Sequence, residues 1–448
     1  MVYNPFMEIF HDFVQLHGIA ISAGILFLAY AFIIMEKVPK VTIALLGATL
    51  TIVLGLLSQE KGSYGNFTTD YYINFIDFNV IFLLVSMMII VNIAAKSGVF
   101  NWVAKELLKF TKGNPKWVLF TLGIFTAIAS AFLDNVTTVI LVMPVTFIIA
   151  KELDIDAMPL LITEILASNI GGTATLIGDP PNIIIGSAAG LSFLDFVVEL
   201  SGIIALIFFV SIGILIFMFR KKLKTTPEKM LHVSKIDNSK TITDFPLLIR
   251  STIVLFLVIL GFILHGVIHI QACIVAMTGA SFLIIFEKPK QVFKDIEWNT
   301  IFFFIGLFII IGGLEASGGI AMMSKWLLDT TQGSQNATAM IILWASGLFS
   351  GIIDNIPYTV TMSPMLVQIQ NTMGVEYTHP LWWCLSLGAC LGGNMTIIGA
   401  AANVIVCETA AAAGRNISFL RFMKYGALIT FISLTLSSFF IYFRFFAN

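Results

Sequence analysis

The chain carries one long apolar stretch at residues 117–150, WVLFTLGIFTAIASAFLDNVTTVILVMPVTFIIA, which is interrupted in its middle by two polar residues. Asp134 and Asn135 divide it into two apolar arms of about 15 residues each. Arms of this length predict a re-entrant helical hairpin, whose tip leaves backbone N–H and C=O groups unpaired. Such backbone is tolerated inside a membrane only where it lines a cavity or binds something, so the tip is a candidate binding site. Asp354-Asn355 repeats the pattern in a second apolar stretch.

The composition agrees with a membrane protein. Hydrophobic residues make up 58% of the 448 residues and charged residues only 11%, whereas a soluble domain carries roughly 25% charged residues. Apolar runs of about 20 residues recur, each long enough to cross a hydrocarbon core of ~30 Å. We predict an all-α polytopic membrane protein with about 10 transmembrane helices, two re-entrant helical hairpins and two broken helices. No nucleotide-binding loop or soluble domain is visible, so we expect no enzyme activity, cofactor, nucleic acid or ATP.

The loop charges predict the orientation. If each interrupted stretch enters and leaves on one side, 22 of the 25 Lys and Arg residues fall on one set of loops. Basic loops stay in the cytoplasm. The sequence therefore predicts a multi-pass protein of the inner (plasma) membrane with both termini on the extracytoplasmic side.

The two halves of the sequence resemble each other. Asp134-Asn135 matches Asp354-Asn355 at an offset of 220 residues, and the run 171–182 matches 392–403 at an offset of 221. Each half makes an odd number of crossings, so the second half begins on the opposite face. Inverted repeats with broken helices are typical of alternating-access carriers. The predicted units are a first repeat at 1–220 (hairpin about 117–150, broken helix about 158–190), a cytoplasmic linker at 221–249, and a second repeat at 250–448 (hairpin about 338–370, broken helix about 380–412).

The broken helices supply the remaining candidate residues. The first break reads GGTATLIGDPPN at 171–182 and the second GGNMTIIGAAAN at 392–403. Consecutive prolines remove backbone donors and disfavour helix at the preceding residue, so two half-helices should meet inside the protein. Half-helix N-termini would hold an anion or polar solute, while carbonyl, Asn and Thr oxygens would hold a cation such as Na⁺. The candidate substrate- and ion-binding residues are Asp134, Asn135, Thr137, Thr138, Glu164, Asn169, Gly172, Thr173, Thr175, Gly178, Asp179, Pro180, Asn182, Asp354, Asn355, Thr359, Asn394, Thr396, Gly399 and Asn403, with candidate Na⁺ sites at Asn135, Gly178, Asn355 and Gly399.

Carboxylates at membrane depth cost about 2.5–3.5 kcal/mol each to insert, so each needs a reason. The candidates are Asp134, Glu164, Asp179, Asp354 and Glu408, with Glu315 near a span end. The sequence places no Lys or Arg at comparable depth, which favours protons or metal cations as partners. The four cysteines lie in apolar segments without metal-ligand spacing, so we expect them to be small packing residues.

The motifs resemble those of a known family. SAFLDNVTTVILVMPVT (130–146), NIGGTATLIGDPPN (169–182), DNIPYTVT (354–361) and LWWCLSLGACLGGNMTIIGAAAN (381–403) are similar to the arsenite-permease and melanocyte P-protein branch of the ion transporter superfamily, which also contains divalent-anion/sodium symporters, citrate transporters and sodium/proton antiporters. The resemblance implies a scaffold domain and an elevator-like transport domain in a homodimer. In the related symporters each tip and its neighbouring loop form a sodium site. Their tips read Ser-Asn-Thr, and here aspartate replaces the serine, which disfavours a dicarboxylate substrate.

These observations lead to an expected ion-coupled secondary active transporter, which moves a small inorganic or organic anion or an arsenite-like solute with H⁺ or Na⁺. A sodium/proton antiporter is the first alternative and an anion channel the second, although paired broken helices argue against a channel. An intramembrane aspartyl protease using Asp134 and Asp354 is disfavoured, because both aspartates precede Asn and lack the Gly-Asp and Tyr-Asp settings of such enzymes.

Overall fold

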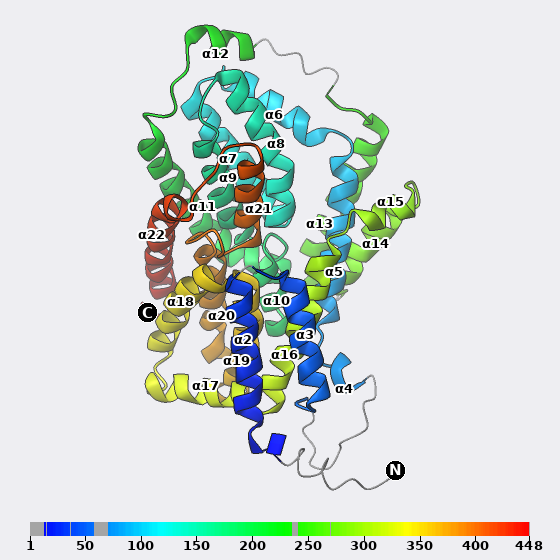
Figure 1. Ribbon diagram of the computed structural model, residues 1–448, viewed down its shortest axis with the longest axis vertical. Helices are drawn as coiled ribbons and strands as arrows, with labels where there is room; N and C mark the ends of the chain where they lie inside the picture. Colours follow the sequence, from blue (N-terminus) through cyan, green and yellow to red (C-terminus); the bar gives the residue numbers. More distant parts are fainter. Residues whose placement is uncertain are drawn as a thin grey trace.

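A computed structural model describes residues 13–14, 16–35, 37–57, 70–234, 241–268 and 270–447. These residues form helices and no strands. The first helices are α2 (Gly18–Met35), α3 (Lys40–Val53), α4 (Asp70–Ile73), α5 (Phe78–Ala95), α6 (Val99–Phe110), α7 (Pro115–Phe132), α8 (Asn135–Leu153), α9 (Met158–Gly172), α10 (Pro180–Ala189) and α11 (Phe193–Phe219) (Figure 1). There follow α12 (Pro227–Ser234), α13 (Phe245–Ile268), α14 (Ala272–Ile284), α15 (Pro289–Lys294), α16 (Trp298–Ala316), α17 (Gly319–Thr330), α18 (Gln335–Ile353), α19 (Asn355–Met373), α20 (Val375–Gly392), α21 (Ala401–Ala412) and α22 (Phe419–Phe445).

The order of helices from α5 to α11 recurs from α16 to α22. The hairpin helices α8 and α19 both have 19 residues, the surface helices α6 and α17 both have 12, and α11 and α22 both have 27. The α6–α8 group lies at one end of the molecule and the α17–α19 group at the other (Figure 1). The orientation of the two groups relative to a membrane stays a prediction.

Nine helices of the described chain are long and apolar enough to cross a membrane. They include both helices of the first hairpin and the first helix of the second, since the arms have 18–19 residues rather than about 15. The helical arms are longer than the apolar runs because capping residues, rather than the loss of hydrophobic residues, determine where the helices begin and end. The Asn114 side chain accepts from the Lys116 N–H at the start of α7, and Asp154 ends α8 in the left-handed conformation.

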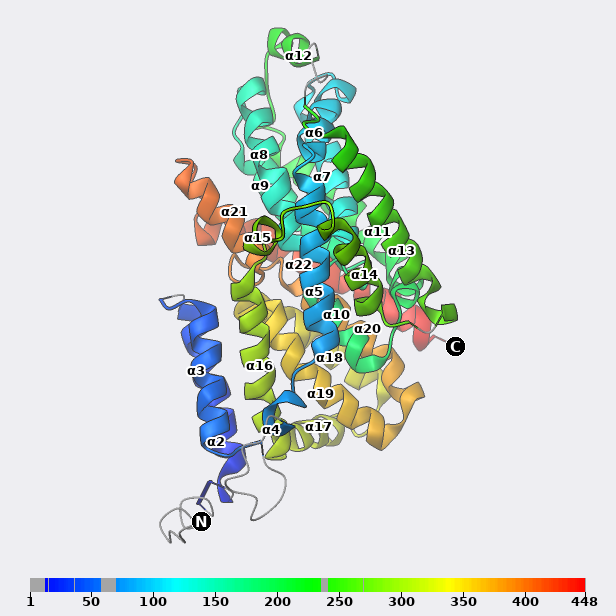
Figure 2. The ribbon, with the colours of Figure 1, turned by 90° about the vertical axis from the view of Figure 1, so that its right-hand side faces the viewer.

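The helix pairs pack as an interlocked bundle. Helix α7 packs on α9, α18 on α20, α3 on α16 and α5 on α14, while α11 and α22 contact each other. Helices α2 and α3 stand at the side of the bundle, and the turn between them lies at mid-height, not at an end (Figure 2). This position brings the start of α3 close to the centre of the molecule.

The predicted linker at 221–249 is partly structured. It contains α12, and α13 begins at residue 245, five residues earlier than the apolar run at 250. Lys222 Nζ lies 3.0 Å from Asp156 Oδ2, and Lys229 pairs with Asp154, so the linker is fastened to the α8–α9 connection. The ion pair with Lys229 lowers the pKa of the exposed Asp154.

Both breaks form where predicted, but for different local reasons. Helix α9 ends at Gly172 and α10 starts at Pro180, whose ring keeps Asp179 in an extended conformation. The second break has no proline. Ala400 is extended as well, and close packing defines the turn, since a Cβ on Gly392 would lie 2.5 Å from the Gly347 carbonyl oxygen.

Candidate functional site

A single carboxylate lies where the two hairpin tips meet the first break. The Asn135 Nδ2 donates to Asp179 Oδ1 at 3.1 Å, and the Asn355 Nδ2 lies 3.1 and 3.2 Å from the two Asp179 oxygens. All three residues are buried, and Asp179 is 0% exposed. The caps of α8 and α19 place the asparagines at the first helical position of each tip. One carboxylate therefore ties together tips that are distant in sequence.

Asn169, on α9, extends this connection to the second break. Its Oδ1 accepts from Asn135 Nδ2 at 3.2 Å, and its Nδ2 lies 2.9 Å from both the Asn394 and the Asn403 Oδ1 atoms. The side-chain amides thus form one buried network across both halves of the chain. Such networks are rigid when every member is satisfied.

Other candidate residues hold the break loops in place. Asn182 Nδ2 donates to the carbonyls of Thr173 and Thr175 at 3.1 and 2.9 Å, and Asn403 Nδ2 donates to those of Gly393 and Thr396 at 2.7 and 2.8 Å. These bonds satisfy carbonyls that the broken helices leave unpaired.

The threonines of the two loops attach them to the hairpins. The Thr175 hydroxyl donates to the Ala131 carbonyl, and the Thr396 hydroxyl donates to the Gly351 carbonyl at 2.6 Å. Thr173 and Thr359 donate to the carbonyls four residues before them, at Asn169 and Asn355. Their hydroxyl protons are therefore used within the fold, although their oxygens can still accept.

Small residues let the loops approach the tips. A Cβ on Gly172 would lie 2.5 Å from the Gly178 carbonyl oxygen, and a Cβ on Gly178 would lie 2.5 Å from that of Ser130. The Gly399 carbonyl accepts from the Asn355 backbone N–H at 3.1 Å. Pro180 borders the cavity described below. The second break thus contacts the second tip directly through the Gly399 carbonyl, and carbonyl oxygens are ligands of the kind that Na⁺ takes.

The pseudo-symmetry of the centre fails at several positions, including Thr173, which corresponds to Asn394 at the offset of 221. At the offset of 221, Asp179 corresponds to Ala400 and Asn169 to Cys390. Cys390 is a buried, small core residue as expected, and its Sγ also lies 3.4 Å from Asn182 Oδ1, to which Ser386 donates at 2.6 Å. Neither Cys390 nor Ser386 was predicted as a site residue, although the repeat offset applied to Asn169 would have identified the cysteine.

The tip aspartates bond to groups outside the amide network. Asp134 is 8% exposed and accepts from the Thr137 N–H at 2.9 Å and from the Thr137 hydroxyl. Asp354 is 1% exposed, accepts from the Ile356 N–H at 3.2 Å, and has a φ of 103°. A positive φ is strained for a non-glycine residue.

Asp354 also corrects one expectation from the sequence, since it has a basic partner. Lys40 Nζ, at the start of α3, lies 2.6 Å from Asp354 Oδ2. The sequence places Lys40 in a loop at the membrane surface, and the mid-height position of the α2–α3 turn explains the difference (Figure 2).

A cavity of about 230 Å³ lies between the tips and helices α3, α5 and α16. Its polar lining consists of Lys40, Asp134, Glu297, Asn299, Thr300 and Asp354. Three carboxyl groups and one ammonium group thus face the same space. Glu297, which precedes α16, was not predicted as a site residue, because only the fold brings it to the tips.

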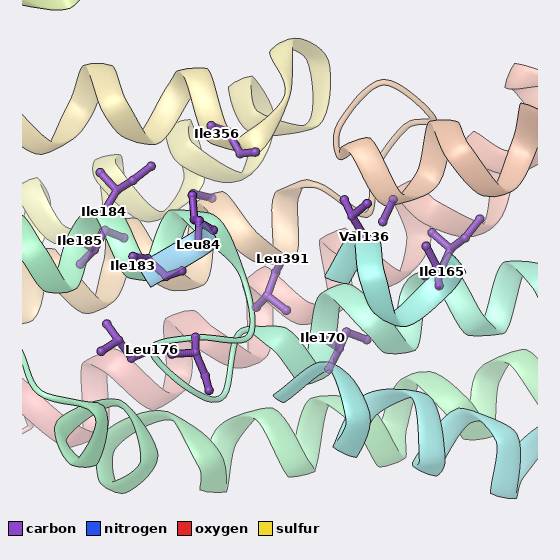
Figure 3. Close-up of a cluster of buried hydrophobic side chains, with 14 of the residues drawn as sticks. Leu84, Val136, Ile165, Ile170, Leu176, Ile183, Ile184, Ile185, Ile356 and Leu391 are labelled. Atoms are coloured by element: carbon purple, nitrogen blue, oxygen red, sulfur yellow. The ribbon is translucent and has the colours of Figure 1, made fainter. Parts of the chain in front are cut away.

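Hydrophobic side chains enclose the polar centre. Val136 and Ile356 follow the two tip asparagines and belong to the same buried cluster as Ile165, Ile170 and Leu176 (Figure 3). Leu84 of α5, Ile183–Ile185 of α10 and Leu391 of α20 belong to the same cluster (Figure 3). Exclusion of water strengthens each hydrogen bond inside it.

Several predicted residues lie outside the central network. Glu164 is fully buried and accepts from the Thr146 hydroxyl at 2.7 Å, while its Oε1 and the Thr138 hydroxyl have no hydrogen-bond partner among the described residues. The side chains of Glu408 and Glu315 are exposed, so neither is a buried carboxylate of the kind that would need a proton or a cation as partner. In the described part of the chain no cluster of three or more His, Cys, Asp or Glu residues is suited to a metal ion.

The apolar helices, paired hairpins and broken helices around a buried polar centre are those of a multi-pass membrane transporter. A family model described as citrate transporter matches residues 30–388. The chain belongs to this citrate transporter family of the ion transporter superfamily, as the motifs implied.

Relatives along the whole length support this assignment. A 46 kDa membrane protein of Mycobacterium leprae is 40% identical, over 95% of this chain and 98% of that protein, and an uncharacterised transporter of Mycobacterium tuberculosis is 39% identical over the same shares. The mouse P protein is 30% identical over 94% of this chain, which spans 59% of the P protein.

One solved structure supports the fold. The Alcanivorax borkumensis YdaH transporter, described as having an unusual topology, matches with a TM-score of 0.53 and 12% identity, covering 96% of this chain and 98% of that one.

Proposed function

We propose that this protein is an ion-coupled secondary active transporter of the inner (plasma) membrane, in which the two hairpin tips and two breaks bind solute and coupling ion. The observation that carries the proposal is Asp179, whose carboxylate accepts from Asn135 and Asn355 of both tips. A cation or proton that binds this carboxylate changes the bonds of both tips at once. The family resemblance adds an elevator-like motion in a homodimer, and the loop charges add both termini on the extracytoplasmic side.

The charge of the cavity favours a cation or a neutral solute over an anion. Asp134, Glu297 and Asp354 face it with Lys40 as the ammonium group in its lining. At an effective dielectric constant of about 20, one carboxylate about 5 Å away opposes an anion by roughly 3 kcal/mol. We therefore place sodium/proton exchange first within the proposal. The same charge argues against an anion channel.

A neutral, arsenite-like solute is the second candidate. It escapes this repulsion, and the amide groups of Asn135, Asn169, Asn355 and Asn394 supply hydrogen-bond partners for its hydroxyl groups. A small anion such as the citrate in the family's name would need Lys40 and the half-helix N-termini to outweigh three carboxylates. The proposed order is therefore cation, neutral solute, anion.

Flux measurements in proteoliposomes test the proposal. Na⁺ and proton gradients are imposed separately while a trapped pH dye and a panel of arsenite and small carboxylates report movement. We expect an Na⁺ gradient to drive proton movement that Asp179→Asn abolishes. The proposal fails if no gradient drives any solute or proton, or if conductance persists as an ungated leak.

A further inference from the structure

The start of α3 contacts the second hairpin through charge. Lys40 Nζ lies 2.6 Å from Asp354 Oδ2, and the exposed fractions of the two side chains are 27% and 2%. Helix α3 packs on α16 and α2, whereas Asp354 caps α19, which packs on α20. The ion pair therefore adds a charged contact between the start of α3 and the tip of the second hairpin, and both α3 and α19 also pack on α16.

A second bond strengthens the same contact. The Tyr30 hydroxyl of α2 donates to the Pro357 carbonyl at 2.7 Å and also contacts the Thr361 hydroxyl. The α2–α3 pair thus holds the first turn of α19 at two points. The tip that it holds is the strained one, since φ is 103° at Asp354 and −62° at Asp134.

Within the described residues, the first hairpin receives no equivalent ion pair from the matching helix. In the second repeat, α14 precedes α16 as α3 precedes α5 in the first repeat. Helix α14 starts at Ala272, after Gln271, and has no lysine at this position. Asp134 accepts hydrogen bonds from Thr137 of its own hairpin. Of the two tip carboxylates, Asp354 is thus the one that the described structure matches with an ammonium group from a neighbouring helix.

The surroundings of the ion pair suit a free cation. Asp134, Glu297, Asn299 and Thr300 line the same cavity and supply carboxylate, amide and hydroxyl oxygens. Hard cations such as Na⁺ take oxygen ligands of these types. Lys40 carries its charge on a flexible stem with an exposed fraction of 27%, so its ammonium group has room to withdraw.

We propose that Lys40 is a tethered competitor for a cation site at Asp354, and that Na⁺ entering the cavity displaces its ammonium group and releases the tip of the second hairpin from α2 and α3. The proposal rests on the proposed ion-coupled transport and names one of its sites and the residue that regulates it. Binding of Na⁺ at the site and release of the second hairpin from α2 and α3 then occur together. This gives cation binding a direct route to movement of the hairpin.

Labelling of a single introduced cysteine tests the competition. Ile356→Cys places a thiol beside the tip, and the four native cysteines are buried, which keeps background labelling low. The full-length protein in proteoliposomes is treated with a thiol reagent while Na⁺ replaces choline at constant ionic strength. We expect Na⁺ to raise the labelling rate of the introduced thiol, with a half-maximal concentration that Lys40→Met lowers by about tenfold or more.

Two further variants separate competition from a structural role. Lys40→Arg keeps the charge and should keep a half-maximal Na⁺ concentration close to that of the parent. Asp354→Asn removes the site and should abolish the Na⁺ response. If Lys40→Met does not fold, as judged by monodisperse elution, Tyr30→Phe replaces it and should lower the half-maximal concentration in the same direction.

The outcomes are distinct. The inference is overturned if Na⁺ does not change the labelling rate of the parent. It is also overturned if the half-maximal Na⁺ concentration of Lys40→Met is the same as or higher than that of the parent. Where Lys40→Met does not fold, the same criterion applies to Tyr30→Phe. Flux is measured in the same vesicles. Absence of flux with an intact competition result refutes the proposed transport and leaves the cation site, whereas normal flux with no competition refutes only the site.

Discussion

Replacement of Asp179 by asparagine should loosen both hairpin tips together. The carboxylate accepts from Asn135 and Asn355, and hydrogen bonds to a charged acceptor contribute about 1.5–3 kcal/mol against about 1 kcal/mol for a neutral one. Two weakened amide contacts therefore lower the free energy of opening by about 2 kcal/mol, or roughly 30-fold in the opening equilibrium. The neutral side chain also cannot release a proton or neutralise a cation.

Hydrogen–deuterium exchange of the two tips measures this effect without knowledge of the substrate. Exchange of the backbone amides at 135–138 and at 355, 356 and 358 should accelerate roughly 30-fold in Asp179→Asn, since exchange follows the local opening equilibrium. Glu408→Gln is the matched control, because it neutralises an exposed carboxylate of α21 outside the network. Acceleration at only one tip, or at neither, would show that Asp179 does not join them.

Three other perturbations have defined outcomes. Asp354→Asn should lose more flux than Asp134→Asn, because it removes a cavity carboxylate together with the Lys40 ion pair, whereas asparagine at 134 removes a cavity carboxylate but still caps α8; equal flux in both variants contradicts this difference. Gly171→Ala places a Cβ 2.1 Å from the Ala127 carbonyl and should destabilise the protein by about 1–3 kcal/mol, whereas Gly202→Ala meets nothing within 4 Å and should leave the thermal unfolding temperature unchanged. Cysteines at the exposed Asn74 and Thr226 should label from opposite sides of oriented vesicles, and labelling of both from one side refutes the predicted orientation.

The positions of the tips and breaks were predictable because local chemistry marks them. Asp134-Asn135 interrupts an apolar run, and the proline pair after Asp179 cannot continue a helix. The roles of these residues were less predictable. Asp134 and Asp354 look equivalent in sequence, yet of the two only Asp354 has a positive φ and, within the described structure, a lysine partner. The lysine partner arises from a tertiary contact with α3.

The contribution of Lys40 and Glu297 could not be read from the sequence for a related reason. Each lies at the start of a helix, where charged residues usually mark a membrane surface. The bundle instead places both helix starts beside the cavity at the tips. For Thr175 and Thr396 the sequence predicted a binding role. In the structure their hydroxyl groups donate to backbone carbonyls and fasten the loops to the hairpins.

The bond from Asn169 to Asn394 joins residues that are 225 positions apart in the chain. During synthesis, the first half is inserted while its partner segment is still being made. During that interval Asn169 and Asp179 can bond to Asn135 of the first half, but their bonds to Asn355, Asn394 and Asn403 stay unformed. The polar centre of this protein is therefore complete only after the second hairpin and the second break have been made and inserted.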